Sequence, residues 1–155
     1  MLAKKANLKR TANTDLSEVE ITLKKYIEIW NKNKKNATES DWRELSRVKY
    51  DLGYLLYLRG FFEDSIHYLK QSVNDAERGN NFVGMWMSKI IENQVAYYGN
   101  IIDLNDYEKI LLESLNFFKN AGYGPEKNPY AIRWIMNTNA HLFELTCDKK
   151  DLKFA

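Results

Sequence analysis

The side chains best suited to catalysis or metal binding are few in this sequence. It contains two histidines, His67 and His141, and one cysteine, Cys147. A zinc site needs a cluster of His, Cys or acidic ligands, and only His141 and Cys147 lie close together in the chain. Their separation places them on different faces of one helix, which argues against a cysteine nucleophile activated by a histidine base.

The remaining catalytic motifs are also missing. The sequence has no glycine-rich phosphate loop of the Walker or dinucleotide type. Neighbouring carboxylates such as Glu63 and Asp64 stand at predicted helix starts, where the helix dipole favours negative charge. We therefore expect a protein without catalytic activity, bound metal or cofactor.

Recognition of another polypeptide is the chemistry that the sequence favours. Aromatic residues make up 14% of the chain, including 10 Tyr and 4 Trp. Tyrosine combines a large ring with a hydroxyl, and an asparagine amide both donates and accepts, as a peptide backbone does. Residues of these types, with arginine and histidine, recur at helical spacing in three segments, and we predict that they bind a partner: Arg47, Tyr50, Tyr54 and Tyr57; Asn93, Tyr97 and Asn100; Arg133, Asn137 and His141. The alternative is that the rings pack between helices and leave only their hydroxyls in water.

A helix hairpin between Ser46 and Gly79 is the element that must position the first of these segments. Apolar residues recur there at three- and four-residue steps, which predicts two helices. We expect the inward residues to be Val48, Leu52, Leu55, Leu56 and Arg59 in one arm and Phe62, Ile66, Leu69, Val73 and Ala76 in the other. Gly60 lies between the arms, where the chain needs a residue that accepts positive φ. A lone hairpin cannot bury both faces, so we expect further helices to stack on it.

The hairpin resembles a known family. The residues that carry the resemblance are Leu52-Gly53, Leu56, Gly60, Phe62-Glu63 and Leu69, and together they resemble the tetratricopeptide repeat, a helix–turn–helix unit of about 34 residues. In that family the paired Leu-Gly allows one helix to pack tightly on the next. Three positions depart from the pattern: Lys49 stands where Trp is frequent, and Ser65 and Ser72 replace alanines.

A second, degenerate match occurs at Asn105-Asp106-Tyr107-Glu108-Lys109-Ile110. From Phe62 in the first match to Tyr107 in the second is roughly 45 residues, which is longer than the usual period. The resemblance implies an all-α fold, in which antiparallel helix hairpins form a short right-handed solenoid of about six helices. It also implies that the first helix of each pair lines a concave surface that holds an extended peptide or a partner helix.

Capping signals predict where the other helices begin and end. Ser17 with Glu20 predicts a capping box for the first helix, and Thr38 or Ser40 is expected to cap the second. We expect further helices over 82–98, from Asp106 as cap to Asn120, and from Pro129 with Asn128 as cap. The predicted organisation is a flexible basic tail over 1–14, a helical domain over 15–146 and a charged tail over 147–155.

Composition sets the remaining expectations. The chain of 155 residues is 45% hydrophobic and 28% charged, with a net charge of +2, as is ordinary for a globular domain. One cysteine and the lack of a long apolar run predict a cytoplasmic protein that does not enter a membrane. Four basic residues in the first ten, Lys4, Lys5, Lys9 and Arg10, are too sparse to predict nucleic-acid binding.

The function predicted from the sequence is therefore a non-catalytic adaptor or regulatory module that binds a protein or peptide. One alternative is the sensor domain of a peptide-responsive transcription regulator, a class built on such repeats. Another is a homo-oligomeric structural subunit, for instance a homodimer joined through exposed aromatic residues.

Overall fold

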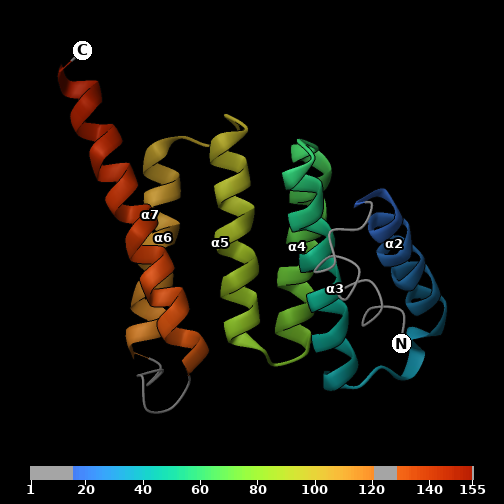
Figure 1. The fold of residues 1–155 in the computed structure, drawn as a ribbon. Coiled ribbons are helices and arrows are strands. Elements are labelled where there is room, and N and C mark those ends of the chain that lie inside the picture. Colours follow the sequence, from blue (N-terminus) through green and yellow to red (C-terminus); the bar gives the residue numbers. More distant parts are fainter. Residues whose placement is uncertain (1–15, 121–128, 155) are drawn as a thin grey trace. The chain divides into compact units, whose positions relative to one another are not determined.

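The computed structural model describes residues 16–120 and 129–154, and within these ranges it contains helices and no strands (Figure 1). The prediction of an all-α fold is thus confirmed. In chain order the elements are α2 (Leu16–Asn33), the 3-10 turn η1 (Lys34–Asn36), α3 (Glu39–Leu58), α4 (Phe62–Arg78), α5 (Phe82–Tyr98), α6 (Leu104–Asn120) and α7 (Pro129–Phe154). The predicted basic tail and the predicted cap Asn128 lie outside the described residues.

Capping explains several of these boundaries. The Thr38 hydroxyl accepts from the backbone N–H of Asp41, and the Asp41 carboxylate accepts from the backbone N–H of Thr38 at 2.8 Å, which confirms Thr38 as the cap of α3. The predicted cap at Ser17 was wrong, because α2 already includes Leu16. The cap of α6 is Asp103 rather than Asp106, since the Asp103 carboxylate accepts from the backbone N–H of Asp106 at 2.9 Å.

The same type of turn follows three of the helices, α3, α4 and α5. Gly60, Asn80 and Asn100 adopt positive φ values of 81°, 51° and 56°, and they recur at even steps of 20 residues. After each helix the chain closes with a backbone bond that spans five residues, as in the bond from the Phe61 N–H to the Leu56 carbonyl at 2.9 Å. The helices that follow, α4, α5 and α6, each have 17 residues. Turns of the same type therefore precede three helices of equal length.

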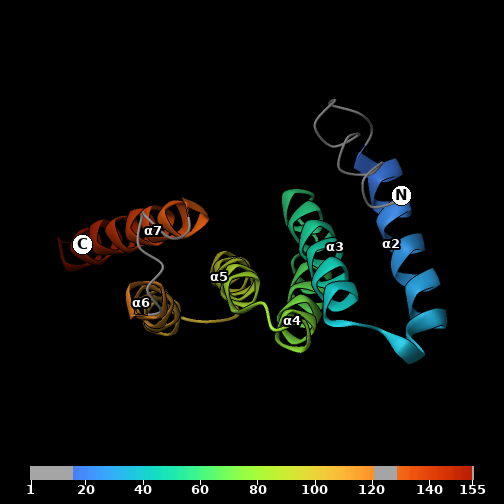
Figure 2. The same ribbon diagram turned by 90° about the horizontal axis from the view of Figure 1, so that it is seen from below.

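The chain divides into two compact units, Met1–Val95 and Ala96–Ala155. In the first unit α3 packs against both α2 and α4, and Figures 1 and 2 show α3 lying alongside α4. A core of buried aliphatic residues joins α2 to α3: Val19, Leu23, Ile27, Leu45, Val48, Leu52, Leu55 and Leu56. Arg59, which we predicted to face inward, is exposed instead, and its guanidinium pairs with Glu20 on α2.

Small residues bring α3 and α4 close together. A methyl group at Gly53 would lie only 2.6 Å from the Leu69 Cγ, so a larger residue would force the helices apart. Ser65 and Ser72 are completely buried in this contact. The Ser65 hydroxyl also donates to the Gly53 carbonyl at 2.7 Å. The two serines thus keep the close packing for which the resembled family uses alanine.

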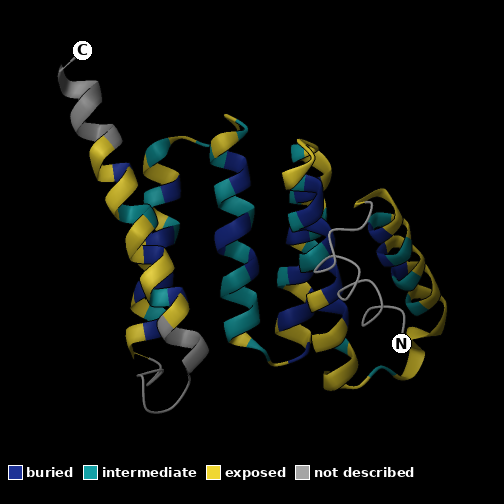
Figure 3. Ribbon diagram, viewed as in Figure 1, coloured by how far each residue is buried: buried dark blue, intermediate teal, exposed yellow. Residues whose placement is uncertain are grey.

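In the second unit α6 packs against α7. The buried residues of α6 are Tyr107, Leu111, Ser114, Leu115 and Phe118, and those of α7 include Trp134, Thr138 and Leu145. Helix α7 continues to Phe154, through most of the charged tail that we predicted over 147–155. Figure 3 shows frequent exposed residues along α7. None of the described helices is apolar over a length sufficient to span a membrane.

Candidate functional site

Four aromatic rings form a continuous row on the first unit. Tyr50, Tyr54 and Tyr57 follow one another on α3, and the row ends at Phe62 on α4. Neighbouring ring centroids are 6.4, 6.2 and 6.0 Å apart, so each ring contacts the next. We call these four residues the tyrosine column. All four are half-buried and lie on a different side of the hairpin from the buried leucines.

The Tyr57 hydroxyl of this column remains protonated at neutral pH. Burial, with a smaller contribution from the neighbouring Tyr54, raises the pKa of Tyr57 above its ordinary value near 10. A neutral tyrosine donates one hydrogen bond and also accepts. Arg47, one turn before Tyr50, is exposed and adds a positive charge at that end of the column. The surface therefore combines apolar area, donors and a cation.

Asn93 is the other predicted binding residue of the first unit. It is half-buried on α5, and its side-chain amide donates to the Lys89 carbonyl one turn earlier at 2.8 Å. One of its two donors is thus used within its own helix. Asn93 therefore offers less than a full amide to a partner.

The predicted residues of the second unit occupy three different settings. Tyr97 stacks on the buried Tyr107 at 5.2 Å between centroids, and His141 meets the same ring edge-on at 6.4 Å. Tyr97 and His141 therefore both pack against a buried ring. Asn100 forms the positive-φ turn after α5. Arg133 and Asn137 are exposed on α7.

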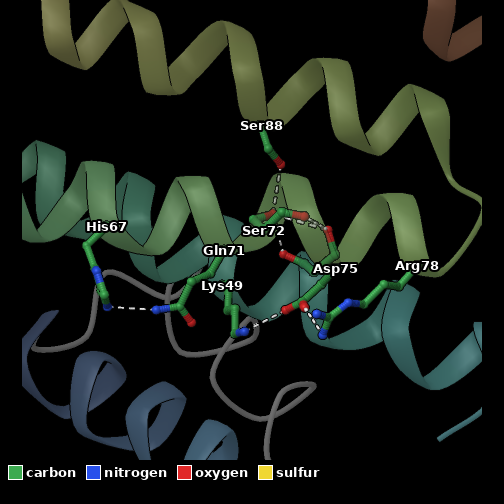
Figure 4. A network of polar contacts seen from close by, with 8 residues as sticks. Lys49, His67, Gln71, Ser72, Asp75, Arg78 and Ser88 are labelled. Atoms are coloured by element: carbon green, nitrogen blue, oxygen red, sulfur yellow. Dashed lines mark hydrogen bonds and ion pairs between the residues drawn. The ribbon is translucent and has the colours of Figure 1, made fainter.

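The structure also contains a polar network that the sequence did not predict (Figure 4). The Lys49 ammonium on α3 donates to the Asp75 carboxylate on α4 at 2.5 Å, and the two side chains are only 8% and 5% exposed. Arg78 approaches the other Asp75 oxygen at 3.9 Å. We had noted Lys49 only as a departure from the resembled family. The available signal was its position three residues before Leu52, in the buried register of α3.

Serines extend this network across three helices. Ser46 on α3 and Ser72 on α4 each donate to the other's backbone carbonyl, at 2.9 and 2.7 Å. The Ser72 hydroxyl also lies 2.8 Å from that of Ser88 on α5, as the dashed lines in Figure 4 show. These buried hydroxyls are satisfied, so they hold the helices at a fixed distance without a cost for unpaired polar groups.

Glu92 on α5 is a carboxylate of the first unit whose pKa changes because it is partly buried. Removal from water raises its pKa, while Lys70 and Lys89 act in the opposite direction. The described residues contain no cluster of His, Cys, Asp or Glu suited to a metal ion. A single carboxylate with a modestly altered environment does not form a catalytic pair.

Comparison of the chain with protein-family models, with curated proteins and with solved structures finds no match. The resemblance to the tetratricopeptide repeat therefore stays a prediction that rests on the residues of the α3–α4 hairpin.

Proposed function

We propose that this protein is a non-catalytic adaptor or regulatory module that binds a peptide segment of another protein along the tyrosine column. In this proposal the helices form a short right-handed, tetratricopeptide-like stack, and α3 lines its binding face. The observation that carries the proposal is the row of four half-buried rings on one side of the hairpin.

The tyrosines of the column lie on α3, which packs against α2 on one side and against α4 on another. Helix α2 packs its aliphatic residues on one face of α3, and the Arg59–Glu20 ion pair ties the C-terminal end of α3 to α2. On another face the Lys49–Asp75 pair and the reciprocal serine bonds join α3 to α4. A rigid surface loses little conformational entropy when a ligand binds, which favours affinity.

The chemistry of the column defines the kind of segment that it would take. Ring faces contact apolar or aromatic side chains, and neutral tyrosine hydroxyls donate to carbonyl or carboxylate oxygens. Arg47 favours an acidic group at the end nearest Tyr50. We therefore infer a peptide with alternating apolar and acceptor groups and a carboxylate near one end. The free thiol of Cys147 supports a reducing, cytoplasmic setting.

Binding of selected peptides tests the proposal. Peptides are selected from a displayed random library on the full chain, and their dissociation constants are measured by fluorescence anisotropy. Tyr54→Ala is expected to weaken binding by about tenfold or more, as for an aromatic hot spot. Adding Asn93→Ala tests whether the predicted α5 stripe takes part.

The matched control is Tyr98→Ala, which removes an exposed tyrosine from the second unit. It is expected to leave affinity unchanged, and far-ultraviolet circular dichroism checks that each variant keeps its helices. Equal affinity of wild type and Tyr54→Ala for every selected peptide would reject the tyrosine column as the binding surface.

A further inference from the structure

Helix α7 has a second apolar stripe on the side away from α6. Met136 and Phe143 are 68% and 71% exposed, and Ala140 and Cys147 between and after them are exposed as well. We call these four residues the outer stripe. Their steps of four, three and four residues place them on one line along the helix, opposite Trp134, Thr138 and Leu145, which are buried.

An apolar line of this kind is the pattern of a helix that packs on another helix. Residues spaced alternately by three and four form the seam of paired helices, where each side chain inserts between those of the facing helix. Helix α7 thus has two apolar sides: α6 covers the inner one, and the described residues leave the outer stripe exposed.

The charges beside the stripe identify what fits on it. Arg133 and Glu144 flank the same edge of the outer stripe, near its opposite ends, and both are exposed. In an antiparallel pair of identical helices, Met136 faces Phe143 of the second copy, and Arg133 then faces Glu144 of that copy. By symmetry both contacts occur twice.

The register of the two contacts agrees. In an antiparallel pair, the twofold axis passes midway between two positions that face each other. For Met136 and Phe143, and for Arg133 and Glu144, these midpoints differ by one residue, or about 1.5 Å along the helix axis. One twofold axis therefore serves both contacts. A parallel pair would instead place this charged edge of the two copies on opposite sides of the seam, so the Arg133–Glu144 contacts would not form.

We propose that the protein forms a homodimer in which the outer stripes of two α7 helices pack antiparallel across a twofold axis. The contact involves about four turns of helix on each side, so it is smaller than a standard interface, and we expect a dissociation constant in the micromolar range. This inference stands apart from the tyrosine column, which lies on the first unit.

Sedimentation equilibrium of the full chain, from about 1 μM to several hundred micromolar, tests the dimer. Wild type is expected to pass from monomer to dimer over this range. Phe143→Glu is expected to raise the dissociation constant by at least roughly 30-fold. Leu112→Glu is the matched control, because Leu112 is an exposed apolar residue of α6 in the same unit, and it is expected to dimerise like wild type.

Charge exchange tests the antiparallel geometry. Arg133→Glu and Glu144→Arg are each expected to weaken the dimer several-fold by placing like charges together, and the double variant is expected to restore it. In the antiparallel pair the two Cys147 residues are separated by about 22 Å, too far for a disulfide.

Three results would overturn the inference. The first is a wild type that stays monomeric at the highest concentration. The second is a dimer that Phe143→Glu leaves intact while circular dichroism shows unchanged helices. The third is rapid Cys147–Cys147 cross-linking of the dimer by a mild oxidant, which would demonstrate a parallel arrangement.

Discussion

The two helix pairs of this protein, α3–α4 and α6–α7, are held together by different means. Between α3 and α4 lie glycine, serines and a buried ion pair, all small or hydrogen-bonded. In the α6–α7 pair the buried residues include the large rings of Tyr107, Phe118 and Trp134, and His141 on α7 meets the Tyr107 ring on α6 edge-on. The first pair is fixed by directional bonds, whereas the second is fixed mainly by packing.

We relate this difference to the two proposed binding surfaces, the tyrosine column and the outer stripe. Directional bonds leave the far side of α3 rigid, which suits a surface that recognises a particular peptide. Packing of large rings leaves α7 with an outer stripe of its own, which suits association with an identical helix. The following three changes test the difference, from the largest expected effect to the smallest.

Breaking the buried ion pair should have the largest effect. Lys49→Ala leaves the Asp75 carboxylate buried without its main partner, and we expect a loss of about 3–5 kcal/mol in the free energy of unfolding. Urea unfolding followed by circular dichroism measures it. The double variant Lys49→Met with Asp75→Leu removes both charges and is expected to lie close to wild type. If Lys49→Ala were as stable as wild type, directional bonds would not be what fixes α3 to α4.

Adding one methyl group at the α3–α4 contact should have an intermediate effect. Gly53→Ala places a carbon within 2.6 Å of the Leu69 Cγ, and we expect a net loss of about 1–2 kcal/mol after the gain in helix propensity. In a Leu69→Ala background the contact with Leu69 is gone and the Ser65 carbonyl oxygen at 3.1 Å remains, so the loss of stability should be much smaller. Additive effects in this double-mutant cycle would contradict the close approach of the two helices.

Removing a buried hydroxyl from the second unit should have the smallest effect and the opposite sign. Thr138 is completely buried, and among the described residues its hydroxyl has no hydrogen-bond partner. Thr138→Val keeps the shape and removes the unpaired group, so we expect stabilisation by about 1 kcal/mol in thermal or urea unfolding. A clear destabilisation would show that the α6–α7 pair also depends on directional bonds.

Sequence reasoning located the helices well, because they end at strong local signals. The predicted helix over 82–98 coincides with α5, and Thr38, one of the two residues predicted to cap α3, is its cap. The positive φ values after α4 and α5 belong to Asn80 and Asn100, and asparagine accepts this conformation more readily than most residues. Helix boundaries depend on a few residues that are close in the chain, so they can be predicted from a single sequence.

Contacts between helices were harder to predict. Lysine is usually found at the protein surface, so the sequence around Lys49 does not indicate that it is buried. Its ion pair with Asp75, 26 positions later in the chain, is what makes its burial favourable. Tyr97 and His141 had the spacing of binding residues, yet both pack on Tyr107. Periodicity identifies the side of a helix on which a residue lies, but the neighbour that covers that side depends on the tertiary arrangement.

The central claim is that a peptide binds the tyrosine column of the first unit. Its most direct test is nuclear magnetic resonance titration of the full chain with a selected peptide, with the tyrosine ring signals assigned. We expect the signals of Tyr50, Tyr54 and Tyr57 to shift in proportion to the bound fraction, while those of Tyr97 and Tyr107 stay in place. Shifts confined to residues of the second unit would contradict the account.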